Sequence, residues 1–140
     1  MRLVRCEATS ETTVANILII DAEERRRLRL ARLLEGAEHQ VRFAPSAAVA
    51  RKAVEEWPVD LVVSALALPD TNGLRLFREL TTAQGWIRCV VFSNADDPVL
   101  IRAMEEGVLA ALALPLAEAQ LMSAVTAALA KPRPWARHVA

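Results

Sequence analysis

Unbroken apolar blocks alternate with amphipathic segments along most of the chain. Residues 15–20 form a continuous β-branched and apolar run, which is typical of a strand buried on both faces. Residues 39–44 alternate through Val41 and Phe43, and further apolar blocks follow at 61–68, 89–92 and 110–114. They predict five strands, at residues 15–20, 39–44, 61–68, 89–92 and 110–114. Between and after them, apolar positions recur at helical spacing. This spacing predicts five helices, at residues 23–35, 46–57, 74–82, 97–106 and 117–130.

Five strands that alternate with five helices predict right-handed crossovers and a parallel sheet with helices on both faces. An open, doubly wound α/β sheet is the expected closure for this number of units. We expect the folded domain to span residues 15–131. Residues 1–14 are polar and unpatterned, so they predict a flexible N-terminal extension, and residues 132–140 predict a flexible basic tail.

The composition agrees with one domain in a reducing compartment. The chain has 140 residues, and its hydrophobic fraction of 54% is enough for a sizeable core. Seventeen basic and seventeen acidic residues cancel, which argues against direct binding of nucleic acid or an anionic membrane. A disulfide between Cys6 and Cys89 is not expected, and the polar start of the chain does not predict a secretory signal. Its apolar stretches are too short to span a membrane. These features predict a cytoplasmic protein.

Four motifs occur in order along the chain: ILIIDAE at 17–23, DLVVSALALPDTNG at 60–73, VVFSN at 90–94 and GVLAALALPL at 107–116. They resemble the motifs ILIVDDE, DLVLLDIMLPDMDG, IVLTA and GADDYLVKPF of receiver domains in bacterial response regulators. The resemblance covers about residues 15–130. It implies a flavodoxin-like fold with strand order 2-1-3-4-5.

The family's chemistry depends on a few polar side chains. An Asp at the end of the third strand accepts a phosphoryl group, and two acidic residues after the first strand help it to hold Mg²⁺. A Lys and a Ser or Thr bind the phosphoryl oxygens, and a nearby aromatic residue responds. The matching positions in this chain are Ala65 for the acceptor, Asp21 and Ala22 for the acidic pair, Leu114 for the Lys, Ser93 for the Ser or Thr, and Ala111 for the aromatic switch.

The resemblance therefore implies a degenerate pseudo-receiver, because the methyl group of Ala65 cannot act as an oxygen nucleophile. We expect no enzymatic activity, no cofactor and no bound metal. We expect Asp21 to keep a structural hydrogen bond to the following loop, and Ser93 to bond to the backbone. The predicted function is phosphorylation-independent signalling by protein–protein contact in a two-component or phosphorelay-related system.

Two other functions stay open. A conventional phospho-accepting regulator would need an atypical acceptor such as Ser64, although strand alternation should point this side chain towards a helix layer. A small-ligand binder would use the carboxyl ends of the strands, although the loop after Ile20 has no glycine before Gly36. Glu23 could replace the missing metal ligand, but an acidic residue is favourable at any helix start.

Two surfaces are candidates for protein contacts. Arg25, Arg29 and Arg32 fall at i, i+4 and i+7 with Arg26 and Arg27 beside them, which indicates either a solvated helix face or a docking stripe for an acidic partner. Arg26 also stands where receivers often carry an apolar residue. The second surface comprises the fourth helix, fifth strand and fifth helix, which commonly mediates dimerisation or output in the family. Its candidate residues for a homodimer are Arg102, Glu105, Glu106, Ala119, Met122 and Thr126.

Overall fold

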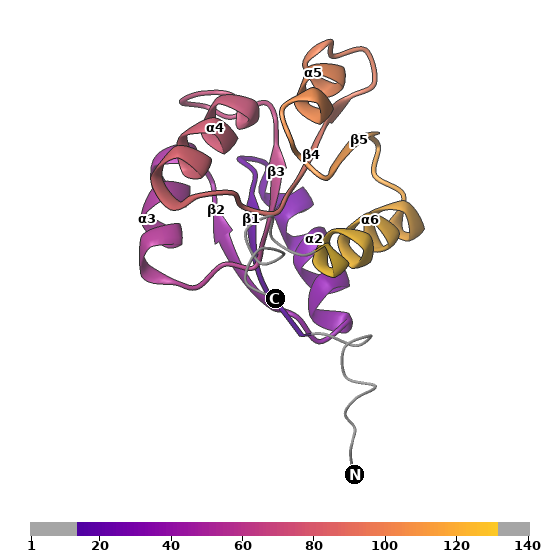
Figure 1. The fold of residues 1–140 in the computed structure, drawn as a ribbon. Coiled ribbons are helices and arrows are strands. Elements are labelled where there is room, and N and C mark those ends of the chain that lie inside the picture. The colour runs from indigo at the N-terminus through magenta and orange to yellow at the C-terminus, as the bar shows by residue number, and fades with distance from the viewer. Residues whose placement is uncertain (1–13, 132–140) are drawn as a thin grey trace.

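Five parallel strands form one sheet in the order β2-β1-β3-β4-β5 (Figure 1). The computed structural model describes residues 14–131. Its strands are β1 (Asn16–Ile20), β2 (Gln40–Ala44), β3 (Leu61–Ala65), β4 (Cys89–Asn94) and β5 (Ala110–Leu114). Its helices are α2 (Glu24–Gly36), α3 (Ala47–Glu56), α4 (Gly73–Gln84), α5 (Val99–Glu105) and α6 (Glu118–Ala130). The doubly wound fold and its strand order are confirmed.

The predicted flexible ends lie almost wholly outside the described residues. The N-terminal extension was expected over residues 1–14, of which the structure describes only Val14, and the basic tail was expected over residues 132–140. Within residues 14–131, none of the helices combines the length and the apolar character that a membrane-spanning helix requires.

Helices cover both faces of the sheet, with α3, α4 and α5 on one face and α2 and α6 on the other (Figure 1). Alternate strand residues divide between the two resulting cores. In β1, for example, Leu18 and Ile20 pack with the first core, and Ile17 and Ile19 pack with the second. Because both faces of each central strand are buried, its sequence is apolar without alternation.

The third strand is shorter than predicted and ends at Ala65 instead of residue 68. The chain turns back immediately after it. The N–H of Leu66 donates to the carbonyl oxygen of Phe92 at 2.9 Å, and the N–H of Gly73 donates to the carbonyl oxygen of Leu66 at 2.8 Å. The segment between Leu66 and Gly73 is therefore a closed loop that leads directly into α4.

In α2 and α3 the buried face is narrower than the spacing of apolar residues predicts. In α2 the buried residues are Leu30, Ala31 and Leu34, whereas Leu28 is 44% exposed. In α3 the buried residues are Ala47, Ala50 and Val54, whereas the apolar residue Val49 is 43% exposed. Each of these two side chains lies on the flank of its helix, outside the stripe that contacts the sheet.

Asp70, in the loop after β3, caps a helix from a distant part of the sequence. Its two carboxylate oxygens accept hydrogen bonds from the backbone N–H groups of Ala47 and Ala48, each at 3.0 Å. These two bonds lower the pKa of Asp70, because they stabilise the ionised carboxylate. The negative charge is also favourable at the N-terminus of α3. Asp70 thereby links the loop after β3 to the N-terminus of α3.

The substitution Asp70→Asn should reduce the free energy of unfolding near neutral pH. The lowered folded-state pKa means that the carboxylate's contribution is present above its ordinary value of 3.8 and is lost as the pH falls through the lower, folded-state value. Denaturant unfolding from roughly pH 7 to pH 3 measures this dependence. The difference between the parent and the variant should shrink in acid. A difference that stays constant across the range would contradict the capping role.

Candidate functional site

The predicted pocket positions meet at the carboxyl edge of the sheet. Asp21 and Ala22 follow β1, Ala65 ends β3, Ser93 lies near the end of β4, and Leu114 ends β5. The register between β3 and β4 places Ala65 opposite Phe92. Ala111 lies away from this edge, inside β5, where it packs against the core beneath α3, α4 and α5. The structure thus brings the five pocket positions together at one edge of the sheet. The switch position, Ala111, lies away from that edge, in the core beneath α3, α4 and α5.

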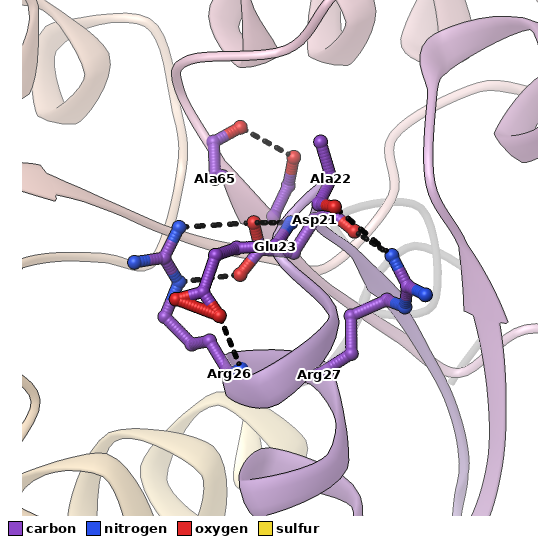
Figure 2. A network of polar contacts seen from close by, with 7 residues as sticks. Asp21, Ala22, Glu23, Arg26, Arg27 and Ala65 are labelled. Carbon is purple, nitrogen blue, oxygen red and sulfur yellow. Dashed lines mark hydrogen bonds and ion pairs between the residues drawn. The ribbon is translucent and has the colours of Figure 1, made fainter.

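Asp21 is buried, with 1% of its surface exposed, and its carboxylate is fully engaged. The guanidinium of Arg26 donates two hydrogen bonds to it, from Nε to Oδ2 at 2.5 Å and from Nη2 to Oδ1 at 3.0 Å (Figure 2). The backbone N–H of Glu23 donates a third at 3.1 Å, which is the loop contact expected of Asp21. Two parallel bonds between guanidinium and carboxylate form a strong, directional ion pair.

Arg26, which the sequence places beside the basic stripe of α2, is therefore a pocket residue. The hydrogen bond from Arg26 to Asp21 raises the pKa of the guanidinium, because the bond stabilises the charged form. Its carbon Cζ lies 5.3 Å from the centroid of the Phe92 ring, within range of a cation–π interaction. The unusual charge at a position that is often apolar in receivers was the signal that could have indicated an inward side chain.

Arg27 holds the same loop from the other side (Figure 2). Its Nη1 donates to the carbonyl oxygens of Asp21 at 2.9 Å and Ala22 at 3.3 Å. The carboxylate of Glu23 accepts the N–H of Arg26 at 2.8 Å and caps α2. The loop after β1 is thus fixed by side chains from the first turn of the helix that follows it.

The hydroxyl of Ser93 is also engaged. It donates to Oδ2 of Asp97 at 2.7 Å, and Oδ1 of Asp97 accepts the N–H of Val99 at 2.9 Å. The prediction that Ser93 bonds to the backbone was wrong, because Asp97 stands at the entry to α5 and reaches back to the end of β4. Ser93 and Asp97 together fix the β4–α5 turn.

The acceptor position offers only a methyl group. Ala65 is 3% exposed and packs with the core beneath α2 and α6. Its neighbour Ser64 points to the opposite face of the sheet, as strand alternation requires, and donates its hydroxyl hydrogen to the carbonyl oxygen of Ala65 at 2.8 Å. Leu114 is half-buried and packs with the same core as Ala65. Of the five pocket positions, only Asp21 and Ser93 carry side-chain oxygens.

These residues do not fit a Mg²⁺ ion, which needs oxygen ligands in near-octahedral geometry. Both oxygens of Asp21 already bond to the cation of Arg26, and Ala22 and Ala65 have no oxygen in their side chains. Glu23 is exposed, and one of its oxygens caps the helix. Among residues 14–131, no group of three or more His, Cys, Asp or Glu side chains is gathered around a point that could hold a metal ion.

An open cleft with a volume of about 560 Å³ lies beside the pocket, between α2 and the chain that joins β5 to α6. It is lined by Glu23, Arg25, Arg26, Arg29, Asn94, Leu114, Pro115 and Leu116. The α2 wall is charged and the β5–α6 wall is apolar. The cleft therefore combines cationic and hydrophobic surfaces at the carboxyl edge of the sheet, where doubly wound proteins bind ligands.

The predicted contact surface comprises α5, the edge strand β5 and α6. Its proposed residues Arg102, Glu105, Glu106, Ala119 and Thr126 are exposed, and Met122 is half-buried. Sequence reasoning missed the two apolar residues that α5 exposes most, Ile101 at 72% and Met104 at 50%. Their helical spacing of three, next to the buried Leu100 and Ala103, was the available signal.

Glu106 is paired with a residue of another helix. Its carboxylate accepts hydrogen bonds from Nε and Nη2 of Arg78 in α4. This pair raises the pKa of Arg78 and lowers the pKa of Glu106, because each charge stabilises the other. Of the predicted interface residues, Glu106 thus lies on the side of α5 that faces α4.

The response regulator receiver domain family model matches residues 17–126 of this chain. Sensory/regulatory protein RpfC of Xanthomonas campestris pv. campestris is 35% identical over 111 residues, which cover 76% of this chain and 15% of RpfC. The DNA-binding transcriptional regulator NtrC of Azospirillum brasilense is 28% identical over 118 residues, covering 84% of this chain and 24% of NtrC. The chain thus spans less than a quarter of the length of these relatives.

Among solved structures, the crystal structure of a response regulator receiver domain protein from Clostridium thermocellum is similar at a TM-score of 0.77. The two sequences are 26% identical, and the alignment covers 83% of this chain and 94% of that one. The similarity therefore extends over nearly the whole of that protein.

Proposed function

This chain belongs to the response regulator receiver domain family, and from that premise we propose that it signals without accepting a phosphoryl group. Receiver domains act in two-component systems together with protein partners. In this proposal the chain is a non-enzymatic pseudo-receiver of such a system, and binding to a partner protein sets its state. Phosphorylation has no part in it.

The observation that carries the proposal is the side chain at the acceptor position. The methyl group of Ala65 is buried, and it has no lone pair with which to attack phosphorus. The isobutyl group of Leu114 cannot neutralise phosphoryl oxygens as a Lys would. The carboxylate of Asp21 is already paired with Arg26, so the pocket holds its own cation where a conventional receiver needs a metal ion.

Incubation with acetyl phosphate and Mg²⁺ should leave the intact mass of the chain unchanged. The physical reason is the absence of an oxygen nucleophile at Ala65. A receiver domain that carries the acidic pair, the acceptor Asp and the Lys serves as the control and should gain one phosphoryl group under the same conditions. Beryllofluoride with Mg²⁺ should likewise leave the amide chemical shifts of this chain in place.

A phosphoryl adduct on this chain would contradict the proposal and favour an atypical acceptor. The variant Ser64→Ala then identifies it, because Ser64 is the hydroxyl adjacent to the acceptor position. Loss of the adduct in this variant would assign the phosphoryl group to Ser64.

We further propose that the chain forms a homodimer through the surface of α5, β5 and α6. Ile101 and Met104 are large apolar side chains that α5 leaves in solvent, and burial in a contact would remove them from water. The strand β5 lies at the edge of the sheet beside them. Exposed apolar side chains that flank a sheet edge are typical of protein contact sites.

The substitution Ile101→Glu should weaken the dimer at least roughly tenfold, because it places a charge in the apolar centre of the contact. Sedimentation equilibrium or light scattering over a range of concentrations measures the dissociation constant. Leu28→Glu is the matched control, since Leu28 is an exposed apolar residue of α2, outside this surface. A parent chain that is monomeric at high concentration, or equal weakening by both variants, would refute the dimer.

A further inference from the structure

The cleft between α2 and the β5–α6 connection lies beside the pocket, at the carboxyl edge of the sheet. We propose that it is a binding site for a compact organic anion, a molecule with an apolar body and one carboxylate or phosphate group. The inference goes beyond signalling by protein contact, because it gives the chain a small-molecule ligand.

The charge of the cleft is the first support. Four charged side chains line it, and three of them are arginines. Arg26 is neutralised by Asp21. Arg25, Arg29 and Glu23 remain, so the two arginines outnumber the one carboxylate, which caps α2. Within residues 14–131 no carboxylate is paired with Arg25 or Arg29. They lie one helical turn apart, so their guanidinium groups can reach the same ligand group.

Arg29 is already held in position. Its Nη2 donates to the carbonyl oxygen of Leu116 across the cleft at 3.0 Å. This bond connects the two walls and uses one of the five N–H groups of the guanidinium, which leaves the others for an anion. A guanidinium whose orientation is fixed loses less conformational entropy when it binds a carboxylate or a phosphate.

The opposite wall explains why the ligand should also have an apolar part. Leu114, Pro115 and Leu116 supply it, and the amide of Asn94 adds one neutral hydrogen-bonding group. A volume of about 560 Å³ is in the range of small-molecule sites, which are largely apolar with a few fixed polar groups. The replacement of Lys by Leu at position 114 increases this apolar surface.

The proposal is tested by titrating the isotope-labelled chain with 2-naphthoate and 2-naphthyl phosphate and following its amide chemical shifts. Both anions carry the same flat apolar body, so the tighter of the two identifies the preferred anionic group. We expect saturable shifts at Arg25, Arg29, Asn94 and Leu116. The neutral 2-naphthamide should bind at least tenfold more weakly. Inorganic phosphate, which lacks the apolar body, should also bind more weakly than 2-naphthyl phosphate.

Three variants of α2 separate a built site from a general basic surface. Arg25→Gln and Arg29→Gln should each weaken binding about tenfold, the loss expected for one charge-assisted contact. Arg32→Gln removes the same charge from the same helix, but Arg32 does not line the cleft. This variant should therefore bind the two anions with the same affinity as the parent chain. Equal loss in all three variants, equal binding of 2-naphthamide, or the absence of saturable shifts with both anions would overturn the proposal.

Discussion

The substitution Arg26→Met should lower the free energy of unfolding by about 3 kcal/mol, because it leaves the buried carboxylate of Asp21 without its counter-ion. Of the three hydrogen bonds that the carboxylate accepts, only the one from the N–H of Glu23 would remain. Methionine preserves most of the apolar packing of the long side chain near Phe92. The decrease in the free energy of unfolding therefore comes mainly from removal of the guanidinium charge. Denaturant unfolding of the parent and the variant measures the difference.

Two further variants test whether the loss comes from this ion pair. Arg32→Gln removes an exposed arginine from the same helix and should change the stability by less than about 0.5 kcal/mol. In the background of Asp21→Asn, the effect of Arg26→Met should be smaller by roughly 1 kcal/mol or more, since the charge that it leaves unpaired is gone. Equal effects of Arg26→Met in both backgrounds would contradict a coupled pair.

The substitution Gly73→Ala should lower the free energy of unfolding by about 2 kcal/mol or more. A Cβ atom at Gly73 would lie 2.4 Å from the carbonyl oxygen of Ala65 and 3.1 Å from Cα of Leu66. Both neighbours are backbone atoms, so no side chain can move aside to relieve the contact. The substitution would force the end of β3 and the start of α4 apart.

The matched control for this prediction is Gly36→Ala. A Cβ atom at Gly36, the last residue of α2, would meet no heavy atom within 4 Å apart from its chain neighbours and the backbone of its own helix, so this variant should be as stable as the parent or slightly more stable. Thermal or denaturant unfolding of the two variants gives the comparison. A Gly73→Ala variant as stable as Gly36→Ala would contradict the close approach between the start of α4 and the end of β3.

The sequence predicted the fold well because the architecture is encoded in local patterns. The run from Ile17 to Ile20 is apolar on both faces, which by itself indicates a central strand covered by two layers of helices. The helix predicted from residue 46 begins as expected, because the hydroxyl of Ser46 accepts the N–H of Val49. Where the predicted boundaries failed, as at the end of β3, a tight loop competed with continued sheet pairing.

The contacts of the site were harder to predict, because they depend on the direction of individual side chains. Arg26 could reach solvent or fold back over the start of α2, and helical spacing does not distinguish the two. The pair between Arg78 and Glu106 joins residues 28 positions apart, and no local pattern indicates it. The bond from Ser93 to Asp97 spans only four residues and was within reach of sequence reasoning, since an Asp at a helix entry can accept a hydroxyl hydrogen.

The ion pair between Asp21 and Arg26 also bears on how the pocket responds to substitution. An Asp introduced at position 65 would add a carboxylate to a pocket in which Asp21 is already paired with Arg26. Loss of Arg26 alone would destabilise the fold before any ion could occupy its place. Because loss of Arg26 leaves Asp21 unpaired, we expect substitutions at positions 26 and 65 to affect the pocket together and not independently.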